Sequence, residues 1–151
     1  MDEIMNHSEK AKATLKEGFS CSQAVLATFC EELNLDRNTA LKLTDAFGGG
    51  IGHMGLTCGA VTGACMVIGL RHGRTAAGDN EAKRITSLLV RELVEEFKNR
   101  NRTMVCKELM GCDLGTREGL LYAKEHDLRN TLCPKFVADA TEILDEILSG
   151  E

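Results

Sequence analysis

The sequence has few aromatic side chains and no concentration of positive charge. Its 151 residues include no tryptophan, one tyrosine and five phenylalanines, and 18 basic residues are outnumbered by 23 acidic ones, for a net charge of -5. Proteins that bind nucleic acids need clustered Lys and Arg for the phosphates, and single-strand binders add aromatic side chains on which bases stack. Here the basic residues are scattered among acidic ones, so we expect no nucleic-acid partner.

Several motifs of cofactor and metal sites are also absent. The chain has no C-x-x-C pair, which argues against a thioredoxin-type motif and a zinc ribbon, and no C-x-x-C-H, which excludes covalent haem. Its four histidines have no H-x-x-x-H spacing. The glycine-rich segment 48–52 lacks the lysine of a phosphate-binding G-x-x-x-x-G-K-[ST] loop, so it is only a weak candidate for an anion site.

Residues 1–17 lack the apolar core and the twin arginines of an export signal. We therefore expect a cytoplasmic protein, in which a disulfide framework is disfavoured and cysteines more often bind metal or react. The segment 51–70 has the length of a membrane span, but five glycines lower its hydrophobicity. We interpret it as a buried helix and expect no membrane span.

One proline and the three-to-four-residue spacing of apolar side chains predict an all-α fold. The expected helices cover about 7–17, 20–33, 36–47, 51–71, 79–98, 104–110, 117–124 and 134–147. No repeat or linker divides the chain, so we expect residues 1–151 to form a single helical domain, a bundle around the glycine-rich helix. The apolar face of the 79–98 helix is expected to contain Ile85, Leu88, Leu89, Leu93 and Phe97.

Four of the seven cysteines lie where a helix is expected to begin or where glycines crowd the backbone, namely Cys21, Cys58, Cys106 and Cys133. Unpaired N–H groups at a helix start favour the thiolate, which is the form that attacks disulfides and binds soft metals. These four cysteines are the candidate catalytic residues, and they are equally the candidate ligands of a metal. As a redox site they would include a thiol with a pKa well below about 8.5, expected at Cys21 or Cys58.

Local sequence explains why helix starts are expected at three of these cysteines. Ser20 and Gln23 form an S-x-x-Q capping box that places Cys21 in a first turn. Thr103 is the expected N-cap residue three positions before Cys106. Proline favours the first helical position, so Pro134 would make Cys133 the cap residue itself.

Gly59 and Gly63 follow Cys58 and lie on one face of the expected central helix. Each costs about 1 kcal/mol relative to alanine inside a helix, so we expect either another backbone or a cofactor to approach closely there. They are the candidate cofactor-binding residues.

The remaining candidates are less specific. Cys30 is interpreted as a packing residue, whereas Cys65 and Cys112 are candidates for auxiliary thiols to which we assign no role. His53, beside the glycine-rich segment, is a candidate ligand or proton shuttle, with a helix-start or loop role as the alternative.

The four cysteines belong to longer motifs along the chain: Cys21-Ser22-Gln23-Ala24-Val25, Phe47-Gly48-Gly49-Gly50-Ile51-Gly52, Cys58-Gly59-Ala60-Val61-Thr62-Gly63, Cys106-Lys107-Glu108-Leu109-Met110-Gly111 and the single Cys133. In order and spacing, from about residue 8 to residue 148, they resemble the redox-active family named for its C_GCAxxG_C_C cysteine pattern. The resemblance implies that these are the family's four defining cysteines, in a haem-free protein that works with an oxidoreductase or a transport system.

Three functions are compatible with these residues. A thiol redox protein would use one cysteine to attack and another to resolve the mixed disulfide. A metal site built from four cysteines would hold zinc or an iron–sulfur cluster on the same four thiolates. A non-catalytic helical interaction module would simply bury them. Formation of a homo-oligomer, through the glycine-rich helix or the helix over 80–98, is a further expectation.

Overall fold

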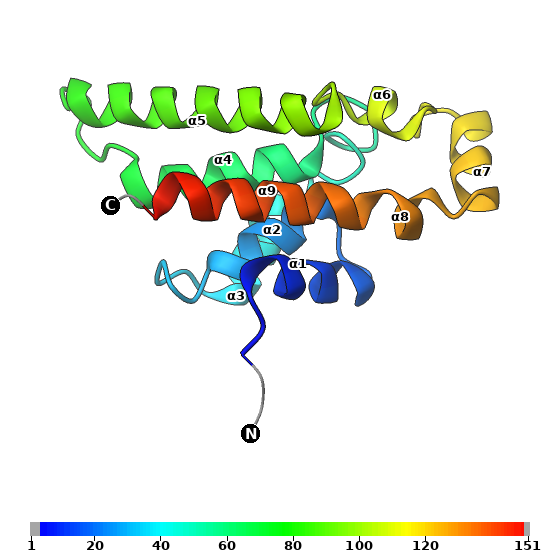
Figure 1. Cartoon of the computed structure of the whole chain (residues 1–151), viewed down its shortest axis with the longest axis horizontal. Helices are drawn as coiled ribbons and strands as arrows, with labels where there is room; N and C mark the ends of the chain where they lie inside the picture. Colours follow the sequence, from blue (N-terminus) through cyan, green and yellow to red (C-terminus); the bar gives the residue numbers. More distant parts are fainter. Residues whose placement is uncertain (1–3, 150–151) are drawn as a thin grey trace.

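Within residues 4–149, which the computed structural model describes, every regular element is a helix (Figure 1). The elements are α1 (His7–Lys16), α2 (Cys21–Phe29), α3 (Arg37–Asp45), α4 (Gly59–His72), α5 (Asn80–Asn101), α6 (Cys106–Met110), α7 (Arg117–Glu125), α8 (Leu128–Thr131) and α9 (Cys133–Leu148). The prediction of an all-α fold is confirmed.

The core forms where α4 packs against α2, α5 and α9. In Figure 1 the two longest helices, α5 and α9, run alongside each other with α4 behind them, while α1 and α3 lie on the opposite side of α2. Leu26, Ile68, Leu93, Phe97 and Ile143 are among the largest fully buried side chains. These residues come from α2, α4, α5 and α9, so the four helices share one apolar interior.

The glycine-rich helix is central, as predicted, but it begins at Gly59, so the expected start at 51 is wrong. Gly49, Gly50, Gly52 and Gly55 have positive φ angles, as do Ile51 and His53. L-residues rarely adopt this left-handed conformation and do not build helices from it, so residues 49–57 form a coiled loop instead. None of the helices within 4–149 is both long and apolar enough to cross a membrane.

Three smaller expectations also need correction. The second helix ends at Phe29, earlier than expected, and turns cover 30–34. Leu88 was placed on the apolar face of the long helix, yet it is 49% exposed because α4 and α9 cover only part of α5. The short helix α8 was not foreseen, since it follows Asp127, a residue in the left-handed conformation.

Two glycines allow α4 to lie directly against the first turn of α2. A Cβ atom added to Gly59 would come within 2.8 Å of the Ser22 backbone nitrogen, and one added to Gly63 within 2.8 Å of the Ser22 carbonyl oxygen. Ser22 is itself fully buried and its hydroxyl donates to the Thr44 carbonyl oxygen at 3.0 Å. The first turn of α2, which contains Cys21, is therefore enclosed by α4 and α3.

Alanine substitutions in α4 test this close approach. We expect Gly63→Ala to lower the free energy of unfolding by about 1–3 kcal/mol, because its methyl group would press on backbone atoms of α2 that cannot move aside. Gly69→Ala is the matched control within the same helix, since a Cβ there has nothing within 4 Å. It should raise the free energy of unfolding by up to about 1 kcal/mol through helix propensity. Urea denaturation measures both, and equal effects of the two substitutions would contradict the packing described.

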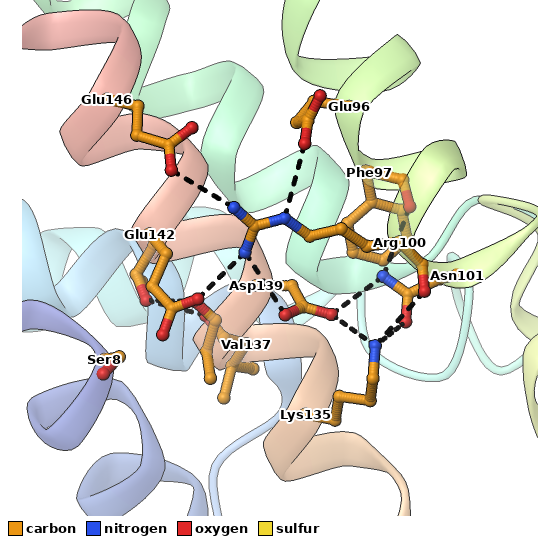
Figure 2. A network of polar contacts seen from close by, with 12 residues as sticks. Ser8, Glu96, Phe97, Arg100, Asn101, Lys135, Val137, Asp139, Glu142 and Glu146 are labelled. Atoms are coloured by element: carbon orange, nitrogen blue, oxygen red, sulfur yellow. Dashed lines mark hydrogen bonds and ion pairs between the residues drawn. The ribbon is translucent and has the colours of Figure 1, made fainter.

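A charged network joins the end of α5 to α9 (Figure 2). Arg100 donates to Glu142 at 2.9 Å and lies 3.4 Å from Asp139. Lys135 donates to the other Asp139 carboxylate oxygen at 2.6 Å and to the Asn101 side-chain oxygen at 2.7 Å. Only 13% of the Asp139 side chain is exposed, so these contacts are partly shielded from water. These contacts hold α9 against α5 from Lys135 onward, two residues after Cys133.

The C-terminal half of α9 is also held by a histidine that lies between two carboxylates. His7 Nδ1 lies 2.6 Å from Asp145 Oδ1, and Nε2 lies 2.6 Å from Glu32 Oε1. The imidazole also lies against the Phe29 ring, with 4.1 Å between centroids. Partial burial lowers the pKa of His7, but the hydrogen bonds and charges of the two carboxylates outweigh burial and raise the pKa above 6.5. The protonated ring thus joins α1, α9 and the turn after α2.

Stability should therefore depend on pH through His7. Because the folded-state pKa is above the unfolded value of 6.5, the contribution is fully present below 6.5 and is lost as pH rises through the folded pKa. We expect His7→Gln to remove this decline when urea unfolding is compared between about pH 6 and about pH 9. His126→Gln is the control, since that histidine is exposed and its Nδ1 contacts only the Tyr122 carbonyl oxygen. An unchanged pH profile in His7→Gln would contradict the assignment.

Candidate thiol site

The four cysteines line a single cavity of about 530 Å³. They reach it from four separate segments: Cys21 from α2, Cys58 from the residue before α4, Cys106 from α6 and Cys133 from α9. The loop 48–50 and the segment from α6 to α8 complete the walls. Cys21 and Cys133, which are 112 positions apart in the sequence, thus line the same cavity.

Cys21 is the first residue of α2, as the capping box predicted. Ser20 accepts a hydrogen bond from the Gln23 backbone N–H, and the Gln23 side chain accepts one from the Ser20 backbone N–H at 3.0 Å. The Gln23 amide also donates to the Leu41 carbonyl oxygen at 3.0 Å, which ties the same turn to α3. These bonds fix the direction in which the Cys21 side chain leaves the backbone.

Cys58 and Cys106 are positioned together by a short backbone pairing. Thr57 and Val105 form an isolated antiparallel bridge. On either side of it the Cys58 N–H donates to the Met104 carbonyl oxygen and the Cys106 N–H donates to the Leu56 carbonyl oxygen. The backbone at Cys58 and Cys106 is therefore fixed by hydrogen bonds, in addition to the packing of side chains.

The expected cap before Cys106 is wrong by two residues. Val105 is the N-cap residue, and Cys106 is the first residue of α6. The Thr103 hydroxyl instead accepts a hydrogen bond from the Val105 N–H at 3.1 Å and donates to Glu108 at 2.9 Å. Thr103 thus closes a local turn before the helix, a competing use of the same side chain.

Gly50 makes room for Cys106. A Cβ atom at this glycine, whose φ is +76°, would lie 2.6 Å from the Cys106 Cβ. The glycine-rich loop therefore contributes bare backbone to the cavity wall where a side chain would displace a thiol.

Cys133 is the first residue of α9, with Leu132 as the cap, so the predicted start is off by one position. The Cys133 and Cys21 thiols are close enough to shift each other's pKa. The Cys133 thiol also donates to the Met110 sulfur at 3.9 Å. Cys133 thus interacts with a second thiol at the cavity, in contrast to an isolated buried cysteine.

Burial raises the pKa of two of the thiols strongly. Loss of hydration raises the pKa of Cys58 to about 12 and that of Cys106 to about 11, and neighbouring cysteines add to both shifts. Only 3% of Cys58 and 8% of Cys106 is exposed, which explains the size of the effect. Both side chains remain protonated thiols at neutral pH.

The pKa values of Cys21 and Cys133 are shifted in opposite directions. Donation of a hydrogen bond to Cys133, together with burial, raises the pKa of Cys21 well above its usual value. The same hydrogen bond lowers the pKa of Cys133, burial opposes the change, and the positive charge of Arg129 lowers it further. The expectation of a low pKa at Cys21 or Cys58 is wrong, because the interaction with Cys133 together with burial at Cys21, and burial at Cys58, outweigh the effect of a helix start.

Arg129 is a member of the site that the sequence did not reveal. It lies on α8, one turn before Cys133, and donates to the carbonyl oxygens of Leu15 and Phe19 at 3.2 and 2.8 Å. These bonds hold its guanidinium group at the cavity without neutralising its charge. The only signal in the sequence is a basic residue four positions before a cysteine, and this spacing is too common to indicate a site residue.

The other candidate residues are distributed around this site or outside it. Cys65 does not share the cavity and lines a separate groove between α4 and α5, and Cys30 donates to the Ala27 carbonyl oxygen and packs in the core. Cys112 is outside the cavity lining, although its proximity raises the pKa of Cys106. His53 lines the cavity, with its ring over Gly49.

The two candidate cofactor-binding glycines differ in position. Gly59 lines the cavity as well as touching Ser22, whereas Gly63 lies against α2 only. Among residues 4–149, no group of three or more His, Cys, Asp or Glu side chains has an arrangement that could hold a metal ion.

A comparison with protein families agrees with the cysteine arrangement. The model of the family described as "Putative redox-active protein (C_GCAxxG_C_C)" matches residues 19–147. The chain belongs to this family. The matched span of this redox-active family contains all four cysteines of the cavity and every helix except α1 and the last residue of α9. No curated protein and no solved structure matches the chain significantly.

The unequal pair predicts that Cys133 is the most acidic thiol of the protein. We expect it to react first with iodoacetamide, with a pH midpoint below the ordinary value of 9.0. Arg129→Gln should raise that midpoint because a positive charge beside the thiolate is removed. Peptide mass mapping of the alkylated protein measures both, with Lys83→Gln on the exposed surface of α5 as the charge-matched control. First alkylation at Cys21 or Cys58 would overturn the assignment.

Proposed function

We propose that the protein carries out thiol–disulfide exchange, with Cys133 as the attacking thiolate and Cys21 as the resolving thiol. One observation supports this best: two thiols from distant helices line the same cavity and interact there, so that the pKa of one is lowered while that of the other is raised. Thiol–disulfide exchange needs this pairing, since the thiolate is the nucleophile and the second thiol completes the reaction.

The proposed reaction has two steps. The Cys133 thiolate attacks one sulfur of a disulfide substrate, forms a mixed disulfide and releases the other half as a thiolate. The Cys21 thiol then loses its proton to that leaving thiolate and attacks the Cys133 sulfur, which releases the second half. The substrate gains two electrons and becomes one thiol and one thiolate, which takes a proton from water, and the protein is left with a Cys21–Cys133 disulfide.

Formation of the mixed disulfide favours the proton transfer in the second step. While Cys133 is a thiolate, it accepts the hydrogen bond that raises the pKa of Cys21. Formation of the mixed disulfide removes this charge and with it the largest cause of the raised pKa. Cys21 therefore becomes easier to ionise once the mixed disulfide at Cys133 has formed.

The oxidised pair must be reduced again before a second turnover. A dithiol reductant, which is the chemistry of a partner oxidoreductase, would donate the two electrons. Cys58 and Cys106 lie in the same cavity as fully protonated thiols and serve as a reserve pair that can exchange with the first one.

Trapping of the intermediate tests this proposal. We expect Cys21→Ser to accumulate a mixed disulfide at Cys133 when it is treated with a small disulfide, and Cys133→Ser to react at least about 100-fold more slowly than the native protein. Intact-mass spectrometry detects the adduct and its site. Cys30→Ser and Cys65→Ser are matched controls that should behave like the native protein, since neither residue lines the cavity.

Elemental analysis of the anaerobically purified protein accompanies this test. Zinc or iron held at about one equivalent with four protected thiols would contradict thiol exchange and favour the metal site built from four cysteines. An adduct formed at Cys58 or Cys106 in place of Cys133 would overturn the assignment of the nucleophile while retaining the reaction.

A further inference from the structure

The cavity has the size of a small-molecule site. Its volume of about 530 Å³ lies within the usual range for such sites, about 300–1,000 Å³. Cys58 and Cys106 are almost completely buried at it, and α7 and α8 contribute one of its walls. A space of this volume can accommodate a free small molecule beside the thiols.

Charged side chains of both signs line this cavity. Lys124 and Arg129 are contributed by the α7–α8 wall, Asp127 lies between them in sequence, and Asp45 belongs to α3. All four residues are exposed, so their charges lie where the cavity opens to solvent. A site for an uncharged disulfide would have no use for them, and a site for a simple anion or cation would carry one sign.

None of the four charges is neutralised by an ion pair within residues 4–149. Arg129 donates to two backbone carbonyl oxygens, and Lys124 has no side-chain partner in that part of the chain. Asp127 accepts a hydrogen bond from the Asn130 amide at 2.8 Å, and Asp45 accepts one from the Gln23 amide at 3.3 Å. Each carboxylate is thus oriented by an amide and keeps a second oxygen for another donor.

We infer that the substrate is a small zwitterionic disulfide of the amino-acid type, with a carboxylate and an ammonium group near each sulfur; this inference rests on the proposed thiol exchange. The substrate carboxylate would bind Arg129, which offers a planar set of donors beside Cys133. Its ammonium group would bind Asp127 or Asp45. The apolar lining of Leu109, Leu114 and Phe136 suits the methylene groups between these charges and the sulfur.

The chemistry is the exchange described above, written for this substrate. The reduced protein and one amino-acid disulfide give the Cys21–Cys133 disulfide and two amino-acid thiols. Two electrons pass from the protein to the substrate, and no other reductant is needed for a single turnover.

A series of small disulfides of different charge tests the inference. The reduced protein is mixed with cystine, cystamine, dithiodipropionate or hydroxyethyl disulfide, which are zwitterionic, cationic, anionic and neutral. The rate of thiol loss is measured by quenching and intact-mass spectrometry. Each rate is divided by that of free 2-mercaptoethanol with the same disulfide, because the disulfides differ in intrinsic reactivity. We expect the corrected rate for cystine to exceed that for hydroxyethyl disulfide by about tenfold or more, the value of one charge-assisted contact.

Substitution of Arg129 separates binding from reactivity. Arg129→Gln should slow every disulfide, since the pKa of Cys133 rises, but it should slow cystine about tenfold more than hydroxyethyl disulfide. Lys124→Gln removes the other positive charge of the α7–α8 wall and should reduce the preference for cystine less than Arg129→Gln does, without shifting the Cys133 alkylation midpoint. Lys83→Gln, remote from the cavity, should leave the preference unchanged.

The failures of the two proposals are distinguishable. Reaction with all four disulfides at similar corrected rates would overturn the zwitterionic substrate and leave thiol exchange intact. A preference for cystamine or dithiodipropionate would replace it by a cationic or an anionic substrate. No reaction with any of them, together with rapid oxidation by a disulfide-bonded unfolded protein, would also overturn the small-molecule inference. No reaction with any disulfide would overturn the exchange itself.

Discussion

The close approach of α4 to the first turn of α2 is the constraint on which the site depends. Gly59 and Gly63 have no side chain to separate the helices, so the backbone at Ser22 lies directly on α4. This contact carries Cys21 to the start of α4, where Cys58 lies. The backbone bridge at Val105 then adds Cys106, and α9 completes the set with Cys133. A single methyl group between α2 and α4 would disturb all of these positions together.

Much of the fold could be predicted because helix signals are local. The capping box at Ser20, the apolar spacing of α5 and α9 and the glycines of α4 each act within a few residues. The errors arose where a side chain or a glycine had a competing role. Thr103 closes a turn before α6, and the glycines at 49–55 adopt left-handed conformations that break the helix expected there.

The cysteines of the site could be selected from the sequence, but their individual chemistry could not. Proximity to a helix start is visible in a sequence, whereas burial, a partner thiol and a neighbouring guanidinium are not. Arg129 acts on Cys133 only because α8 turns its side chain toward the end of α1 and the carbonyl oxygens found there. The lowered pKa lies at Cys133 rather than at Cys21 or Cys58 because the interaction with Cys21 lowers it and the charge of Arg129 lowers it further.

The position of Cys133 at the start of α9 has a consequence for folding. In the proposed oxidised state, a covalent bond between α2 and α9 would close a loop of more than about 100 residues, which lowers the entropy of the unfolded chain by the equivalent of nearly 5 kcal/mol. Thermodynamic linkage makes the relation reciprocal, since the folded protein holds the two sulfurs together and so favours their bond by the same amount. Oxidation and folding therefore support each other, and reduction of the disulfide by an electron pair lowers the free energy of unfolding of the protein.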